Sequence, residues 1–173
     1  MNIGNGKLII ISGAPGVGKS TTAEALVKKL KPVIEISTDS FRYSVLPYAF
    51  PWDEPEGTHQ LIMGVESACS TARIYLNGGY NVVINDVFTP KSFQIYQSLL
   101  NEFSGISVLL QPSLDIALSR NDAREKNIPP DEIARRYNAL KQFDFDFILD
   151  NSNISIDKLT KQILVLTNST KTL

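Results

Sequence analysis

A glycine-rich segment near the N-terminus constrains the fold of this chain more than any other feature. The segment reads Gly13-Ala14-Pro15-Gly16-Val17-Gly18-Lys19-Ser20 and matches the pattern G-x-x-x-x-G-K-[ST]. An apolar run at residues 8–11 precedes the segment, and a stretch with helical character begins at Lys19. The pattern therefore predicts a strand, a tight glycine loop and a helix in immediate succession, as at the start of an α/β fold.

The chemistry of this loop indicates a phosphate site. Glycines allow backbone N–H groups to turn toward phosphate oxygens, and the positive end of the following helix points to the same place. Lys19 can reach the β- and γ-phosphates of a nucleoside triphosphate, and the Ser20 hydroxyl can ligate Mg²⁺. We therefore expect ATP and Mg²⁺ as cofactors, with every residue from Gly13 to Thr21 at the nucleotide.

Further apolar runs predict a parallel sheet. Strands are expected at about residues 7–12, 33–37, 81–85, 106–110 and 145–149, alternating with helical patterns. Near-continuous apolar strands of this kind are covered on both faces. The predicted fold is a three-layer P-loop NTPase fold with five parallel strands in the order 2-3-1-4-5, and one domain suits the 173 residues. The residues expected along the ligand edge are Ser12, Ser37, Asp86 and Gln111.

Helices are expected between these strands. They cover about residues 19–30, 58–76, 90–102, 113–120 and 131–142, with a last helix capped by Ser155 and a short one near Asp39. Residues 120–136 are expected to form a short arginine-bearing lid, and residues 168–173 a disordered tail.

The residues after the second predicted strand indicate an acceptor site. Asp39 can accept a proton from an attacking hydroxyl, and position matters more than basicity because the transition state of phosphoryl transfer is loose. Arg42 lies one helical turn further on and would suit an anionic acceptor. Two alternatives stay open: Asp39 as a helix N-cap, and Arg42 as a surface ion-pair partner.

With these positions in place, the sequence resembles the polynucleotide 5′-hydroxyl kinases and is similar to the chloramphenicol phosphotransferases. The former carry an Asp-x-x-Arg after the second strand, matched here by Asp39 and Arg42. The resemblance implies that Asp39 is the general base and that Arg42 holds a phosphate on the acceptor. It also implies that Arg120 and Arg124, in Arg-Asn-x-x-Arg, act from the lid on the transferring phosphoryl group. The alternative for that arginine pair is a solvated basic face.

Both groups also have an Asp that closes the third strand, here Asp86. This carboxylate can hold a Mg²⁺-bound water or orient Arg42, or it can simply cap the strand. An aromatic loop with Tyr48, Phe50 and Trp52 can form an acceptor wall by stacking, or a satellite hydrophobic cluster.

Two further segments carry weaker expectations. The resemblance to these kinases implies that the stretch after the last strand packs beside the adenine base, with Ser152 or Asn153 near the nucleotide, unless it is an ordinary turn. Arg135 and Arg136 are expected to pair at the surface with Asp131 or Glu132.

Composition limits the possible functions. The net charge is −1, so no broad basic footprint for duplex DNA is present, and no apolar run is long enough to span a membrane. The one cysteine, Cys69, favours a cytoplasmic setting. We expect a monomer or small homo-oligomer.

The preferred function is transfer of the γ-phosphoryl group from ATP to a hydroxyl of a small molecule such as an antibiotic, a sugar or a nucleoside-like alcohol. The first alternative is a nucleic-acid 5′-hydroxyl kinase. The chain has no surplus of basic residues that would favour this alternative. The second alternative is a nucleotide-dependent switch, for which no water-orienting glutamine is evident.

Overall fold

The computed structural model describes residues 6–49, 54–123 and 128–169. Within these residues, five strands form one parallel sheet in the order β2-β3-β1-β4-β5. The strands are β1 (Leu8–Ser12), β2 (Val33–Ser37), β3 (Asn81–Asp86), β4 (Gly105–Leu110) and β5 (Phe147–Leu149). The sheet therefore confirms the strand order and the parallel direction predicted from the sequence.

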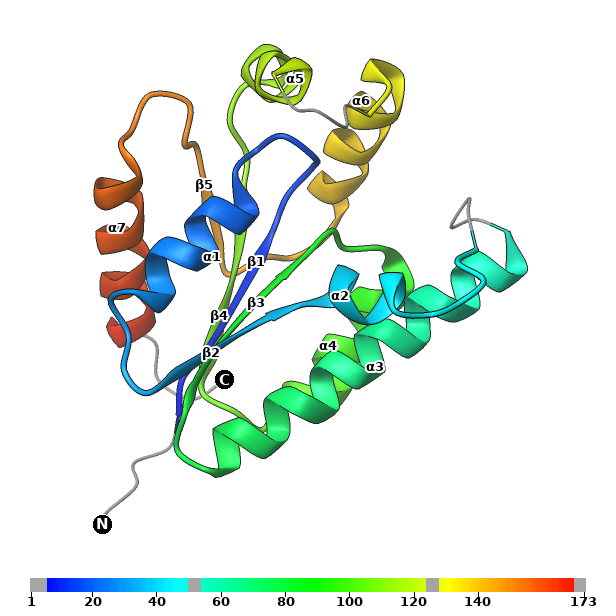
Figure 1. Cartoon of the computed structure of the whole chain (residues 1–173). Coiled ribbons are helices and arrows are strands. Elements are labelled where there is room, and N and C mark those ends of the chain that lie inside the picture. The colour runs from blue at the N-terminus through cyan, green and yellow to red at the C-terminus, as the bar shows by residue number, and fades with distance from the viewer. Residues whose placement is uncertain (1–5, 50–53, 124–127, 170–173) are drawn as a thin grey trace.

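Helices surround this sheet on both faces. They are α1 (Lys19–Val27), α2 (Thr38–Tyr43), α3 (Pro55–Asn77), α4 (Pro90–Leu100), α5 (Leu114–Asp122), α6 (Pro130–Ala139) and α7 (Ile156–Ser169), with a short 3-10 helix η1 (Leu140–Gln142) after α6. Figure 1 shows α1 and α7 on one face and α3 and α4 on the other, while α5 and α6 lie beyond the carboxyl ends of the strands. The three-layer arrangement is thus the one that buried parallel strands require.

The central strand accounts for the position of the core. Every residue of β1 is buried, and the strand is paired on one side with β3 and on the other with β4. The face of α3 predicted to be apolar is buried against the sheet. Its residues are Leu61, Val65, Ala68, Cys69, Ala72 and Leu76. Burial of such a stripe, more than intrinsic propensity, stabilises a helix in a folded protein.

Some element ends differ from their predicted positions. Helix α1 ends at Val27 rather than near residue 30, in a turn before Pro32. Helix α3 begins at Pro55 rather than near residue 58, because proline fits a first turn whose N–H groups need no helical partner. Strand β5 is shorter than expected, and α7 continues to Ser169, so residues 168 and 169 belong to a helix rather than to a tail.

The strand register brings the predicted ligand-edge residues together. Ser12 at the end of β1 is opposite Asp86 at the end of β3, and Ser37 at the end of β2 is opposite Asn85. Since the strands are parallel, the glycine loop after β1 and helix α2 after β2 leave the sheet at the same edge (Figure 1). Among the described residues, no helix is long and apolar enough to cross a membrane.

Candidate active site at the carboxyl edge of the sheet

The glycine loop between β1 and α1 has a backbone that other residues would strain. Gly16 and Gly18 have φ angles of 84° and 98°, in the left-handed region that favours glycine. A Cβ at Gly13 would lie 2.8 Å from the Leu110 carbonyl oxygen, and one at Gly16 would collide with the Ala117 carbonyl oxygen. The glycines are therefore required by both conformation and close packing.

Lys19 folds back across this loop. Its Nζ donates a hydrogen bond to the Ala14 carbonyl oxygen at 3.1 Å, so the ammonium group lies over the loop that precedes its own helix. This is the place from which a lysine reaches the phosphates of a bound nucleotide.

A pocket of about 500 Å³ opens beside the loop and α1. Its walls include Gly16, Gly18 and the first turn of α1 through Thr22. Arg120 of α5 and residues of the β5–α7 segment complete the lining. The volume lies in the range of nucleotide-sized ligand sites.

The residues predicted to bind the nucleotide fall into two groups, those that line the pocket and those that are buried in the loop. Gly16, Gly18, Lys19, Ser20 and Thr21 line it. The other members, Gly13, Ala14, Pro15 and Val17, are buried in the loop. Buried residues of this kind contribute to such a site through the course of the backbone rather than through side chains.

Arg120 is held by backbone carbonyls around the pocket. Its guanidinium donates to the carbonyl oxygens of Asn151 at 3.1 Å and of Ser152 at 3.4 Å, and to that of Val17 at 3.5 Å. These contacts link α5 to the glycine loop and to the β5–α7 segment. Arg120 is therefore not part of a solvated basic face, which was the alternative for this residue. Its action on the transferring phosphoryl group stays a prediction. Arg124 lies outside the described residues.

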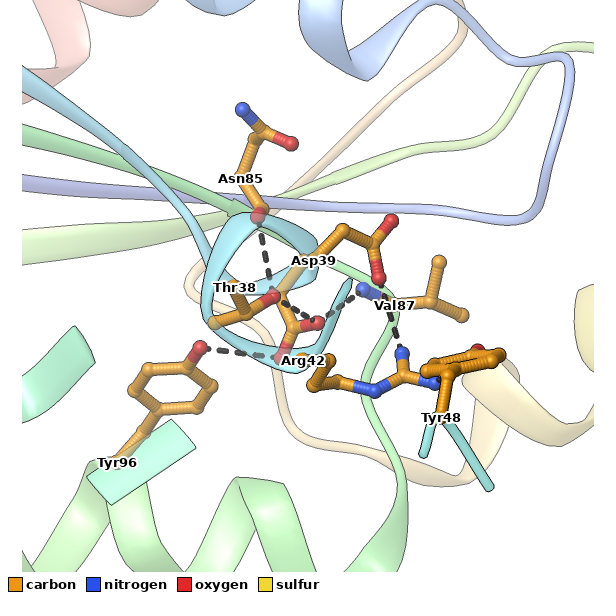
Figure 2. Close-up of polar contacts among 8 residues, drawn as sticks. Thr38, Asp39, Arg42, Tyr48, Asn85, Val87 and Tyr96 are labelled. Atoms are coloured by element: carbon orange, nitrogen blue, oxygen red, sulfur yellow. Dashed lines mark hydrogen bonds and ion pairs between the residues drawn. The ribbon is translucent and has the colours of Figure 1, made fainter. Parts of the chain in front are cut away.

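On the acceptor side, α2 begins directly after β2 and carries Asp39 and Arg42 on the same side. Arg42 Nη1 pairs with Asp39 Oδ1 at 2.9 Å, and Arg42 Nη2 donates to the Tyr48 hydroxyl at 3.1 Å (Figure 2). The Arg42 side chain is 4% exposed and that of Asp39 is 49% exposed. The pair therefore has a buried cation and a carboxylate that stays accessible.

This geometry decides between the alternatives for these two residues. The N-cap of α2 is Ser37, so Asp39 does not cap the helix. Arg42 is buried rather than a surface ion-pair partner, and it packs so closely on α3 that a Cβ at Gly64 would lie 2.7 Å from its Cγ. Of the predicted aromatic wall, Tyr48 contacts Arg42, and Phe50 and Trp52 lie outside the described residues.

Asp86 points into a buried network rather than toward Arg42, which is a correction to one of its predicted roles. Thr38 Oγ1 donates to Asp86 Oδ1 at 2.6 Å, and the Tyr96 hydroxyl donates to Asp86 Oδ2 at 3.0 Å. The Val87 amide also donates to Oδ1, at 2.8 Å. Burial raises the pKa of Asp86 to about 6, against the lowering effect of these hydrogen bonds.

Sequence reasoning missed three residues of this region. Thr38 and Tyr96 form the network around Asp86, and Asn151 lines the nucleotide pocket and donates from Nδ2 to the Val17 carbonyl oxygen at 2.8 Å. The expected neighbours of the nucleotide behave differently: the Ser152 hydroxyl accepts from the Ser113 amide, and Asn153 is exposed. Residues of this segment line the pocket, while its place beside the adenine base stays a prediction. Only packing selects the residue in the segment that turns inward.

Glu132 binds the arginines of α6. Arg135 and Arg136 both pair with its carboxylate, at 2.7 and 2.6 Å, as their position in the sequence predicted. Their hydrogen bonds lower the pKa of Glu132 to about 2. Both arginines are therefore engaged by a carboxylate of their own helix.

The residues at the loop fit a magnesium ion that is held mainly by a substrate. Ser20 is exposed in the pocket, next to Lys19. The described residues contain no cluster of three or more His, Cys, Asp or Glu that would form a complete metal cage. Mg²⁺ needs no such cage, because it commonly keeps several waters and binds through one or two protein groups and the substrate phosphates.

The sheet order, the glycine loop and the pocket beside it define the chain as a P-loop protein with a kinase-like fold. Residues 8–147 match the model of a family described as an AAA domain, and the chain belongs to that family.

Solved structures share this fold over nearly the whole chain. The tunicamycin resistance protein of Deinococcus radiodurans is similar with a TM-score of 0.73 and 17% identity, covering 95% of this chain and 97% of that one. A sugar kinase from Janibacter sp. HTCC2649 gives 0.72 and 16%, covering 94% and 95%. The Pnkp1/Rnl/Hen1 RNA repair complex gives 0.65 and 21%, covering 81% of this chain and 47% of the matched chain. At these identities, the similarity establishes the fold alone.

Proposed function

We propose that this protein is a phosphotransferase that moves the γ-phosphoryl group of ATP to a hydroxyl group of a small molecule. The observation that carries the proposal is the shared edge of the sheet. The loop with Lys19 and the accessible carboxylate of Asp39 both follow strands that end there. Phosphoryl transfer requires mainly positioning and charge stabilisation, and this edge supplies both.

In the proposed reaction, the acceptor oxygen forms a bond to the γ-phosphorus while the bond from that phosphorus to the β,γ-bridging oxygen breaks. The acceptor proton passes to the Asp39 carboxylate, and Lys19 stabilises the negative charge on the phosphates. The products are a phosphate ester and the nucleoside diphosphate. Bound Mg²⁺, with Ser20 as a protein ligand, would neutralise charge on the phosphate oxygens.

The state of Arg42 favours an uncharged acceptor. Its guanidinium is buried and engaged by Asp39 and Tyr48, so a phosphate on the acceptor would have to compete with an ion pair inside the protein. In this geometry, Arg42 restrains the carboxylate that accepts the proton. The similarity to a sugar kinase along nearly the whole chain is consistent with a small neutral alcohol as acceptor.

A nucleic-acid 5′-hydroxyl kinase is the second candidate. The similarity to a chain of an RNA repair complex and the spacing of Asp39 and Arg42 favour it. The net charge of −1 opposes it, because single-stranded ends are usually held in a positive groove. A nucleotide-dependent switch is a third candidate, and it would hydrolyse the triphosphate without an acceptor.

Labelled transfer separates these candidates. Purified protein, Mg²⁺ and γ-labelled ATP are incubated with sugars, nucleosides, aromatic alcohols and 5′-hydroxyl oligonucleotides, with and without a 3′-phosphate. We expect label on a small alcohol, with a loss of about 100-fold or more for both Lys19→Ala and Asp39→Asn. The control is Asp115→Asn, at an exposed acidic position in the first turn of α5.

Three outcomes would contradict the proposal. Full transfer by Asp39→Asn would exclude that carboxylate as the base. Label found only on oligonucleotides, with Arg42→Ala harming phosphorylated acceptors far more than neutral ones, would favour the nucleic-acid kinase. A rate of ATP hydrolysis that none of the acceptors changes would favour the nucleotide-dependent switch.

The cellular setting and the assembly are part of the proposal. We place the enzyme in the cytoplasm as a monomer or small homo-oligomer. The buried free thiol of Cys69, whose pKa burial raises to about 12, is consistent with a role in the core rather than in disulfide chemistry.

A further inference from the structure

A network of three buried side chains lies under the start of α2, and the proposed reaction gives none of them a direct role. Thr38 begins α2, Asp86 ends β3, and Tyr96 comes from the middle of α4. Both hydroxyls donate to the Asp86 carboxylate, one to each oxygen (Figure 2). The network therefore joins the start of α2 to β3 and to α4 on one face of the sheet.

The first turn of α2 lacks the usual side-chain cap and is bonded to β3 instead. Helix α2 has six residues, and the side chain of its N-cap Ser37 makes no capping hydrogen bond. A helix this short is marginal by itself. The Thr38 hydroxyl instead lies at the end of β3, 2.6 Å from Asp86 Oδ1 and 3.4 Å from the Asn85 carbonyl oxygen, and its one hydrogen favours the nearer carboxylate. Thr38 is the residue immediately before Asp39.

The buried carboxylate of Asp86 also indicates a role other than packing in the core. A buried carboxylate is expensive to desolvate, and an apolar group of similar size often stabilises such a position better. Asp86 is nonetheless buried beside Phe88 and Tyr96, and its oxygens accept from Thr38, Tyr96 and the Val87 amide. Each carboxylate oxygen therefore accepts at least one hydrogen bond inside the core.

We propose that Asp86, together with Thr38 and Tyr96, is a positioning group that holds the first turn of α2 against β3 and thereby aims the Asp39 carboxylate at the acceptor hydroxyl. In this role Asp86 acts through its hydrogen bonds to donors in the core rather than as a ligand of Mg²⁺. The inference rests on the proposed function, in which Asp39 accepts the proton.

The first test compares two substitutions of one side chain. Thr38→Val removes the hydroxyl and keeps the shape, and Thr38→Ser keeps the hydroxyl. We expect Val to lower kcat for transfer at least about tenfold with an unchanged KM for ATP, since a misplacement of about 1 Å can reduce a rate about 100-fold. Ser should stay within about twofold of wild type. Equal kcat in all three proteins would overturn the proposal.

The second test asks whether the effect passes through Asp39. Thr38→Val is combined with Asp39→Asn, and the residual transfer is followed with labelled ATP over long incubations. A positioning role predicts no further loss in the double variant, because the group to be aimed is already gone. A second tenfold loss would show that the network acts independently of Asp39.

A magnesium titration of Asp86→Asn separates positioning from metal binding. We expect the Mg²⁺ concentration for half-maximal rate to stay within about twofold of wild type while kcat falls. An increase of more than about tenfold, with kcat restored at saturating Mg²⁺, would make Asp86 a metal ligand and overturn the proposal.

A final measurement does not depend on turnover. Amide hydrogen exchange of residues 38–43 should accelerate in Thr38→Val and Tyr96→Phe and stay at the wild-type rate in Thr38→Ser. If residues 38–43 exchange at the wild-type rate in both Thr38→Val and Tyr96→Phe, the inference is overturned even when the enzyme is active. The two proposals can fail separately. If the wild type transfers label to no acceptor but the variants show the expected exchange rates, the proposed function is refuted and the anchoring of α2 still holds.

Discussion

Asp86 shows how one buried side chain connects stability to pH. Its pKa is about 6 in the folded protein, against 3.8 for an ordinary Asp, and burial is the main cause. The folded state therefore binds this proton more tightly than the unfolded state does. The charged carboxylate lowers stability above about pH 6, and this loss is relieved as the pH falls from about 6 toward 3.8.

We predict that this relief disappears in Asp86→Asn. The difference in unfolding free energy between wild type and variant should shift in favour of wild type as the pH falls through this window. The full shift is on the order of 3 kcal/mol, from about 1.4 kcal/mol for each pH unit. Urea denaturation at several pH values between 4 and 8 measures this shift. A pH-independent change in unfolding free energy caused by the substitution does not affect the shift. A pH-independent difference would contradict the assignment of the raised pKa to Asp86.

At the scale of elements, the segment between β5 and α7 braces the glycine loop from outside. Asn151 donates to the Val17 carbonyl oxygen, and Arg120 of α5 reaches carbonyls on both sides of the pocket. The Oδ1 atom of Asn151 is buried and has no hydrogen-bond partner among the described residues. The loop is therefore shaped by its own glycines and also by contacts more than 100 residues away in the sequence.

We predict that Asn151→Ala weakens nucleotide binding without disturbing the acceptor side. Loss of the buried hydrogen bond should raise the Kd for Mg²⁺-ATP about fivefold, since one such bond contributes about 1 kcal/mol. Isothermal titration calorimetry measures the Kd, and Asn153→Ala at an exposed position of the same segment is the control. Equal affinity for both variants would show that the brace has no effect on the nucleotide.

At the scale of the whole molecule, the site is formed where separate layers meet at one edge of the sheet. The glycine loop leads into α1 on one face, while Asp39 and Arg42 are on α2, which packs on α3 of the other face (Figure 1). A ligand that binds only the folded arrangement must stabilise it by mass action.

We predict that Mg²⁺-ATP raises the Tm of this protein. At a concentration of about 100 times Kd the stabilisation is about 2.7 kcal/mol, or roughly 5–10 °C for a chain of this size. Differential scanning fluorimetry measures the shift. Lys19→Ala should lose most of it, and Lys28→Ala, exposed at the end of α1, should keep it. A wild type with no shift would remove the basis for nucleotide binding.

The sequence by itself determined the sheet, its strand order and the glycine loop. The strands and the loop depend on apolar runs and glycine patterns that are local in the chain, and the strand order follows from the P-loop fold that the glycine motif indicates. The spacing of Asp39 and Arg42 likewise predicted a shared helix face, which their ion pair confirms.

Only the tertiary structure decided where polar side chains point. Asp86 turns to Thr38 and Tyr96, Arg42 is buried against α3, and Asn151 rather than its neighbours faces the pocket. The physical reason is that each of these orientations depends on hydrogen-bond partners or packing surfaces far away in the sequence. A linear pattern records which side chains are present at the edge of the sheet, and packing alone selects their partners.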